Sequence, residues 1–160
     1  MFKKLTITLA LLAAVAFGCG KSSTYKTGDG EVTVDKKGGQ VTYQGKSKEG
    51  SIKISANESG VALPDDFPKD VPIYKGAVVK VASTQGKAMM VSMVSPASVA
   101  DILKYYQEQL KDQGWEIQST MNIGEGSMIS AKKATRQCSA MVLKQEKDTM
   151  IQLTVMQEGA

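Results

Sequence analysis

The chain of 160 residues contains no histidine, and this absence excludes more chemistry than any other feature of its composition. Histidine is the commonest general base and the commonest metal ligand, and it activates the nucleophile of Ser-His and Cys-His pairs. Carboxylate, lysine or tyrosine chemistry stays open, but these residues form no recognisable catalytic constellation. The sequence therefore predicts a protein that is not an enzyme and that carries no cofactor.

An excess of one charge is also lacking. Lysine and arginine number 20 against 16 aspartate and glutamate residues, and aromatic residues make up only 6% of the chain. The basic residues are scattered and are not interleaved with aromatic ones, whereas a nucleic-acid surface needs a concentrated basic patch. We therefore expect no nucleic-acid partner.

Long apolar runs are missing except at the start, where residues 5–17 carry no charge. These thirteen residues follow Lys3 and Lys4 and precede Gly18 and Cys19. A membrane-spanning helix needs about 20 apolar residues, whereas a cationic start, a short apolar region and a small residue are typical of an export signal. The sequence predicts a signal peptide over residues 1–18, cleaved between Gly18 and Cys19.

The segment Val15-Ala16-Phe17-Gly18-Cys19 resembles the lipobox of bacterial lipoproteins, although Ala16 stands where leucine is usual and Phe17 is bulkier than the usual residue. In that family the thiol of the cysteine receives a diacylglycerol before cleavage. The resemblance implies a lipid anchor on Cys19, and an ordinary secretory signal is the alternative. Gly20 occupies the place where aspartate favours the inner membrane of Gram-negative cells. This implies the outer membrane, facing the periplasm, or the outer face of the cytoplasmic membrane in a cell with one membrane.

Cysteine is scarce as well, because Cys138 is the only one besides Cys19. With Cys19 acylated, no intramolecular disulfide is possible. Cys138 lies in an alternating segment typical of a strand, and a free cysteine there behaves as a small buried hydrophobic residue. A reactive or intermolecular thiol is the alternative.

The first part of the mature chain is rich in Ser, Thr, Gly and Lys. Residues 19–30 lack apolar periodicity and predict a flexible tether. Residues 31–60 hold three short alternating runs separated by glycine-bearing turns, which predict a β-strand repeat region in the form of a three-stranded meander. Its apolar positions are too few for a core of its own, so it must pack against the main domain, pair with another chain or be marginally stable.

Proline is rare, yet three of the four prolines lie between residues 64 and 72. They predict an extended connector over residues 61–75. The string from Leu63 to Tyr74 resembles a Leu-Pro-x-Asp-Phe-Pro-x-Asp-Val-Pro-x-Tyr segment of uncharacterised bacterial lipoproteins. Those proteins are also similar in their glycine-rich β-runs before the segment and in a helix ending in Gly-Trp after it. The resemblance covers most of residues 30–118 and implies a shared envelope setting without a known activity.

Residues 76–160 predict the main domain. Ser95 and Pro96 predict the start of its only helix, with Ser98 and Asp101 as a rival capping pair one turn later, and Gly114 predicts its end. Two strands before the helix and four after it give the order β-β-α-β-β-β-β. The predicted fold class is α+β, an antiparallel sheet with one helix packed on one face, preceded by the separate meander.

Three groups of residues could carry a site. Asp65, Asp66 and Asp70 could bind Ca²⁺ on a flexible loop, although a solvated acidic loop fits better. Methionines could join Cys138 in a Cu(I) site, although flexible core filling explains them more simply. They are Met89, Met90, Met93, Met121, Met128, Met141, Met150 and Met156. Tyr105, Tyr106 and Trp115 could form a platform for a glycan, although core packing fits them better.

These observations together predict a membrane-anchored bacterial envelope lipoprotein with a non-enzymatic binding or scaffolding domain. Its partners are the membrane, through the N-terminal lipid, and another envelope protein or a wall component. The alternative is a lipoprotein that binds a small ligand or a soft metal such as Cu(I). No metal site is predicted for the preferred function.

Overall fold

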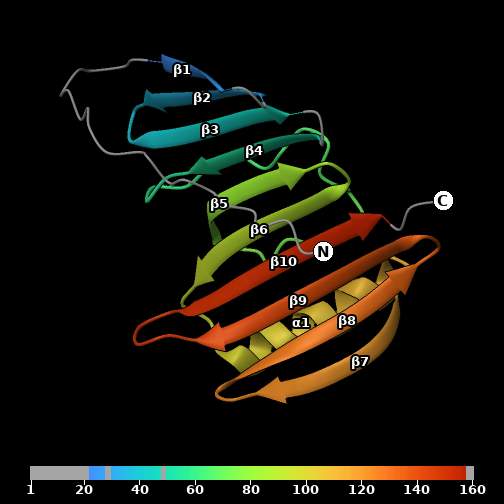
Figure 1. Ribbon diagram of the computed structural model, residues 1–160. Helices are drawn as coiled ribbons and strands as arrows, with labels where there is room; N and C mark the ends of the chain where they lie inside the picture. Colours follow the sequence, from blue (N-terminus) through green and yellow to red (C-terminus); the bar gives the residue numbers. More distant parts are fainter. Residues whose placement is uncertain (1–21, 28–29, 48–49, 158–160) are drawn as a thin grey trace, which may run out of the picture.

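The structure is a computed structural model that describes residues 22–27, 30–47 and 50–157. Within these residues ten antiparallel strands form one sheet in the order β1-β2-β3-β4-β5-β6-β10-β9-β8-β7 (Figure 1). The strands are β1 Ser22–Thr27, β2 Gly30–Lys37, β3 Gln40–Ser47, β4 Gly50–Ala56, β5 Val78–Gln85, β6 Ala88–Ser95, β7 Glu116–Ile123, β8 Gly126–Lys133, β9 Arg136–Lys144 and β10 Thr149–Gln157. The described chain has one α-helix, α1, at Val99–Asp112.

The predicted fold class is wrong. The chain does not form an α+β domain preceded by a separate three-stranded meander, because one continuous antiparallel sheet with a single short helix runs through both regions. The N-terminal strands and the strands of the main domain are connected by the pairing of β4 with β5, in which Ile54 lies opposite Ser83. Sheet pairing is made by backbone hydrogen bonds, to which every residue except proline can contribute both a donor and an acceptor. The pattern of side chains therefore did not reveal that β4 and β5, which the connector separates in the sequence, are paired.

The N-terminal half also contains a strand where the sequence predicted flexible chain. Residues 22–27, within the predicted tether 19–30, form β1 and pair with β2. The strand contains only one large apolar residue, Tyr25, so it lacks the apolar periodicity that signals a strand. Its backbone nevertheless completes the hydrogen-bonding edge of β2. The Gly38–Gly39 turn between β2 and β3 has positive φ at both residues, which is the geometry of a two-residue type I′ hairpin.

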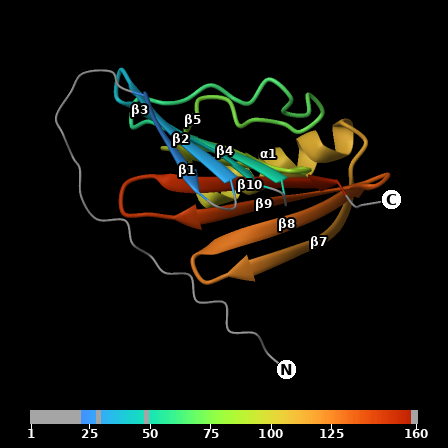
Figure 2. The same cartoon turned by 45° about the horizontal axis from the view of Figure 1, so that its top comes forward.

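Helix α1 begins one turn later than the preferred prediction. Its N-cap is Ser98, whose hydroxyl oxygen accepts a hydrogen bond from the Asp101 backbone nitrogen at 3.1 Å, whereas Ser95 lies at the end of β6. Pro96 favours an extended conformation for the residue before it, and this keeps Ser95 in the strand. The helix buries Ile102, Tyr106 and Leu110 and contacts β7, β8 and β9 on one face of the sheet (Figure 2).

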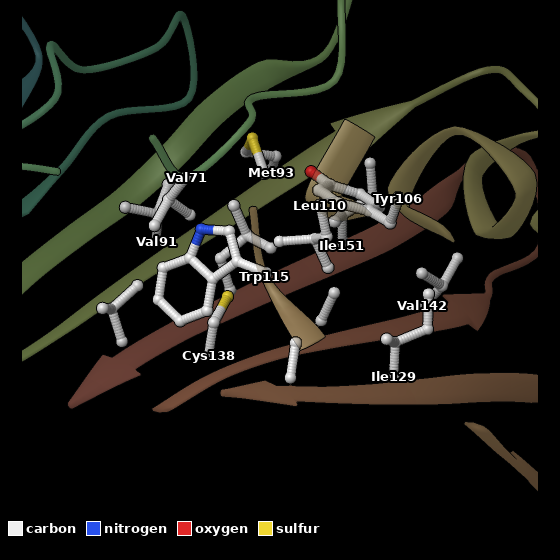
Figure 3. Packing of buried hydrophobic residues seen from close by; sticks show 14 of the residues in the cluster. Val71, Val91, Met93, Tyr106, Leu110, Trp115, Ile129, Cys138, Val142 and Ile151 are labelled. Carbon is white, nitrogen blue, oxygen red and sulfur yellow. The ribbon is translucent and has the colours of Figure 1, made fainter. Parts of the chain in front are cut away.

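The hydrophobic core lies between α1 and the C-terminal half of the sheet. Val91, Met93, Ile129, Val142 and Ile151 project from the strands toward the helix, as Figure 3 shows. The connector contributes Phe67 and Val71 to the same core. The part of β1–β4 that the structure describes contributes no residue to this cluster. The core therefore holds together the connector, β5–β10 and α1, and the first four strands extend beyond it.

No helix among the described residues is long and apolar enough to cross a membrane.

Candidate binding surface

The predicted anchor residues, Gly18 and Cys19, lie outside the described residues. The structure does fix where the chain enters the fold after them. Strand β1 begins at Ser22, three residues beyond Cys19, and forms one edge of the sheet. Any anchor at Cys19 would therefore be attached almost directly to this edge.

The side of the sheet to which each N-terminal side chain belongs follows from the register. Lys53 lies opposite Thr84, Thr84 lies opposite Met89, and Met89 packs against the core. Residues directly opposite on paired strands point to the same face, so Lys53 is on the side that carries α1. Ile54, one residue further along β4, points to the other side because side chains alternate along a strand.

Strands β1–β4 carry apolar side chains on the side of the sheet away from α1. We call this surface the apolar N-terminal face, and it consists of Tyr25, Val32, Val34, Val41, Tyr43, Ile52 and Ile54. Tyr25, Val41 and Tyr43 are exposed by 56%, 40% and 37%. The other four side chains are half-buried. No described element covers this face, and an exposed apolar patch of this kind marks an interaction site.

Gly45 lies at the centre of this face between two larger side chains. A Cβ atom there would come within 3.0 Å of Ile52 Cγ2 and 3.5 Å of the Tyr43 ring. Tyr43 and Ile52 therefore pack over the glycine backbone. Gly45 thus leaves room for the two larger side chains on either side of it.

The opposite side of the same strands is polar. It carries Lys26, Glu31 and Asp35 on β1 and β2, and Gln44 and Lys53 on β3 and β4. A shallow cleft of about 390 Å³ lies here between these strands and the connector. Its lining includes Gln44, Lys53, Pro64, Asp65, Asp66 and Thr84. The apolar side of the sheet thus changes between its two halves, since it faces α1 in β6–β10 and faces away from α1 in β1–β4.

The acidic cluster predicted from the sequence is divided in the structure. Asp65 and Asp66 are exposed, which agrees with the solvated acidic loop that the sequence favoured. Asp70 instead accepts two hydrogen bonds from the Arg136 guanidinium, at 2.8 and 2.6 Å, and one from Lys133 Nζ at 2.8 Å. Among the described residues no three His, Cys, Asp or Glu side chains are placed to hold a metal ion. The Ca²⁺ alternative therefore has no assembled site in this part of the chain.

The Asp70 cluster fastens the connector to the main domain. Arg136 also lies 5.0 Å from the centre of the Trp115 ring, and Trp115 Nε1 donates a hydrogen bond of 2.7 Å to the Asp70 carbonyl oxygen. The hydrogen bonds from Arg136 and then from Lys133 hold the pKa of Asp70 well below its usual range, although partial burial acts in the opposite direction. Sequence reasoning missed this cluster because its residues come from separate parts of the chain, namely the connector, the segment after α1, and strands β8 and β9.

Cysteine and methionine do not form the soft-metal site that the sequence suggested. Cys138 is 1% exposed on the core side of β9, and burial raises the pKa of its thiol to about 12. Met141, three residues further along the same strand, points to the other side. Core filling is correct for Met93 and Met89 and wrong for the other six methionines considered, which lie on the side away from α1. They are Met90, Met121, Met128, Met141, Met150 and Met156.

Three of these methionines lie side by side. Met121 of β7 is directly opposite Met128 of β8, and Met128 is directly opposite Met141 of β9. Neighbouring strands are about 4.8 Å apart, so flexible thioether side chains in such a row can approach one another. We call these residues the methionine row. Their alternation is visible in the sequence, but their register across three strands is not.

The aromatic residues considered for glycan binding belong to the core and its border. Tyr106 is fully buried and Trp115 is 2% exposed. Tyr105 packs edge-on against Tyr74 and donates a hydrogen bond of 2.8 Å to the Ile73 carbonyl oxygen. Core packing is therefore confirmed for Tyr106 and Trp115, and Tyr105 secures the connector.

The described residues form one sheet with a single helix, and the exposed groups described above lie on the two faces of the sheet. Residues 77–149, which run from the start of β5 to the start of β10, match a family model described as START domain-like. This similarity is compatible with non-enzymatic binding. No curated protein and no solved structure matches the chain. Side chains buried between α1 and the sheet fill the space there, so the exposed surfaces described above are the candidate binding sites.

Proposed function

We propose that this protein is a membrane-anchored envelope lipoprotein of bacteria whose domain binds another component without catalysing a reaction. A lipid on Cys19 would hold it at the outer membrane, facing the periplasm, or at the outer face of the cytoplasmic membrane where only one membrane exists. The lipobox-type segment supports the anchor. The START domain-like similarity supports a binding domain.

The observation that carries the binding role is the uncovered apolar N-terminal face. A sheet that is apolar on one side gains free energy when that side leaves water, at about 25 cal/mol for each Å² of apolar surface. The polar side of the same strands offers amide, ammonium and carboxylate groups around the cleft beside Asp65 and Asp66. These groups suit hydrogen bonding to an envelope protein or a wall polymer.

Mass spectrometry of the protein purified from bacterial membranes tests the anchor. We expect an N-terminal peptide that begins at Cys19 and carries a diacylglyceryl group. An unmodified N-terminus at another residue would overturn the assignment. The Cys19→Ser variant serves as the control and should lose the diacylglyceryl group.

A photo-crosslinking residue introduced at Gln44 or Lys53 tests the binding role of the polar side. We expect a defined adduct with an envelope protein or wall polymer in living cells. The same residue at Lys104, on the solvent side of α1, is the matched control and should give none. Equal labelling from all three positions would show that the cleft has no partner of its own.

The methionine row supports a second candidate function, the binding of Cu(I). Three thioethers on neighbouring strands are soft ligands of the kind that select Cu(I). An anaerobic titration in competition with a chelator tests it, and the triple variant with leucine at residues 121, 128 and 141 keeps the size and polarity of the row. Cu(I) binding that the leucine variant abolishes would support the site. Binding that is absent, or unchanged in the variant, would end this candidate.

A further inference from the structure

We infer that the apolar N-terminal face lies against the lipid surface of the membrane that holds the anchor. The inference rests on the proposed lipid at Cys19 and deepens the proposed function, since it names the partner of this face. Three observations carry it: the reach of the chain, the composition of the face and the polarity of the opposite side.

The reach of the chain restricts the position of the sheet edge. Ser22 begins β1 three residues after Cys19, and a chain spans at most about 3.3–3.6 Å per residue. The start of β1 therefore lies within about 11 Å of the Cys19 Cα atom, whose side chain would carry the lipid. With the edge fixed so close to the bilayer, only the orientation of the sheet remains to be decided.

The composition of the face decides that orientation. Along β1–β4 its only charged residue is Lys36, which lies opposite Val41, and the described residues on this face include no carboxylate. Tyr25 and Tyr43 combine an apolar ring with a polar hydroxyl, and such side chains favour the boundary between headgroups and acyl chains. A lysine without a neighbouring acid on the same surface suits anionic headgroups.

The opposite side of these strands favours water. Glu31 and Asp35 on β2 and Lys53 on β4 all point there, together with Gln44. Turning the polar side to the bilayer would dehydrate these charges, which costs free energy. A sheet laid with its apolar side down leaves the polar cleft, the connector and α1 directed away from the membrane.

The anchor also lowers the affinity that this contact requires. A lipid on Cys19 holds the face at a high effective concentration near the bilayer and so raises the fraction of time for which the contact is made. The contact in turn adds a second attachment to the lipid chains, and membrane anchoring becomes stable when it has two signals.

Vesicle flotation of the chain from residue 19 with Cys19→Ser tests the inference, because this variant lacks the lipid but retains every described strand. The vesicles consist of phosphatidylethanolamine and phosphatidylglycerol at a ratio of 3:1. We expect the protein to float with the vesicles and to remain bound in high salt. Adding Tyr43→Glu should reduce the bound fraction at least tenfold, whereas adding Thr24→Glu should change it less than twofold.

The two substitutions form a matched pair, since each adds one negative charge to an exposed residue, at Tyr43 on the apolar side of the sheet and at Thr24 on the side that carries α1. Circular dichroism melts of both variants identify any loss of folding. A Tyr43→Trp variant provides a second measurement, because its fluorescence should shift to the blue with vesicles and be quenched by brominated lipid. An absence of both flotation and quenching, or an equal loss in both glutamate variants, would overturn the inference.

A second copy of the chain is the rival occupant of this face. Light scattering would then show a dimer that Tyr43→Glu dissociates, together with no flotation, and this result would also overturn the inference. Failure of the proposed anchor is a separate outcome. It would appear as an unmodified Cys19 in mass spectrometry and would leave the flotation of the Cys19→Ser chain unchanged.

Discussion

Asp70 differs from Asp65 and Asp66 although the three residues lie in the same short segment. Asp65 and Asp66 are solvated. Asp70 instead forms ion pairs with Arg136 and Lys133, and its carbonyl oxygen accepts a hydrogen bond from Trp115 Nε1. An acidic residue in a proline-rich segment does not reveal from sequence whether it faces water or a cation across the fold. The residues that pack by periodicity were predictable, as Tyr106 shows. The partners of Asp70 were not, because they are set by tertiary structure.

The Asp70→Asn variant should lower the free energy of unfolding by about 2 kcal/mol at pH 7, because it weakens charge-assisted hydrogen bonds. Urea denaturation measures the change, and the exposed Asp66→Asn variant is the control, with an expected change near zero. The pKa of Asp70 is depressed in the folded state, so its stabilising contribution is complete above its unfolded pKa of about 3.9.

That contribution is lost as the pH falls through the folded value. The difference in stability between the native chain and Asp70→Asn should therefore narrow from pH 5 to pH 2. A difference that stays constant over this range would show that Asp70 acts through packing alone.

Cys138 should be unreactive in the folded protein. Its thiol is buried and its pKa is raised to about 12, while the thiolate is the reactive form. In the Cys19→Ser chain, where Cys138 is the only thiol, modification by a disulfide reagent at pH 8 should be at least a hundredfold slower than in guanidinium chloride. Rapid modification without denaturant would show that β9 opens readily.

At the scale of elements, the strands and the helix were more predictable than their ends. Alternation predicted the strands of the C-terminal half, and an apolar stripe predicted α1. The helix start was missed by one turn because Ser95 and Ser98 are both good capping residues, and the choice depends on where β6 ends. Strand β1 was missed because its pairing depends on the free edge of β2 rather than on its own side chains.

The turns between strands offer a test at this scale. Ala134 has a φ of 53° in the turn between β8 and β9, and Gly124 has a φ of 56° in the turn between β7 and β8. A side chain in this conformation costs about 1–2 kcal/mol. Ala134→Gly should therefore stabilise the protein by about 0.5–1 kcal/mol, and this gain is net of the greater entropy of glycine in the unfolded chain.

Gly124→Ala is the matched substitution with the opposite sign. A Cβ atom at Gly124 would meet no atom within 4 Å, so only backbone strain acts there. We expect a destabilisation of about 1 kcal/mol. Thermal or urea unfolding measures both variants, and changes of the same sign would contradict the argument from backbone conformation.

At the scale of the whole molecule, the sheet is uniform in its hydrogen bonding but not in its packing. The core lies between α1 and the C-terminal half, while among the described strands β1–β4 pair with the rest of the sheet through β5. The sequence predicted that the N-terminal runs were too poor in apolar residues for a core of their own. It could not show that they continue the main sheet, since this continuation is made by the backbone pairing of β4 with β5.

Hydrogen exchange should reveal this gradient. Amide protection follows the local free energy of opening, so we expect the slowest exchange in β9 and β10 and progressively faster exchange from β4 to β1. Mass spectrometry of deuterated peptides measures it, both with and without phosphatidylglycerol-containing vesicles. Uniform protection across the ten strands would contradict the uneven packing. Slower exchange in β1–β4 with vesicles would agree with a membrane-bound face.

The attachment of the chain at the outer edge of β1 has a mechanical consequence. A pull on Ser22 directed away from the sheet would load the β1–β2 hydrogen bonds one after another rather than all at once, and then those of each following pair. Separation of β1–β4 would release residues 22–56, about 120 Å of extended chain, while α1 and its core stayed folded. The first four strands would then unfold at low force and lengthen the chain, and they would refold when the force is removed.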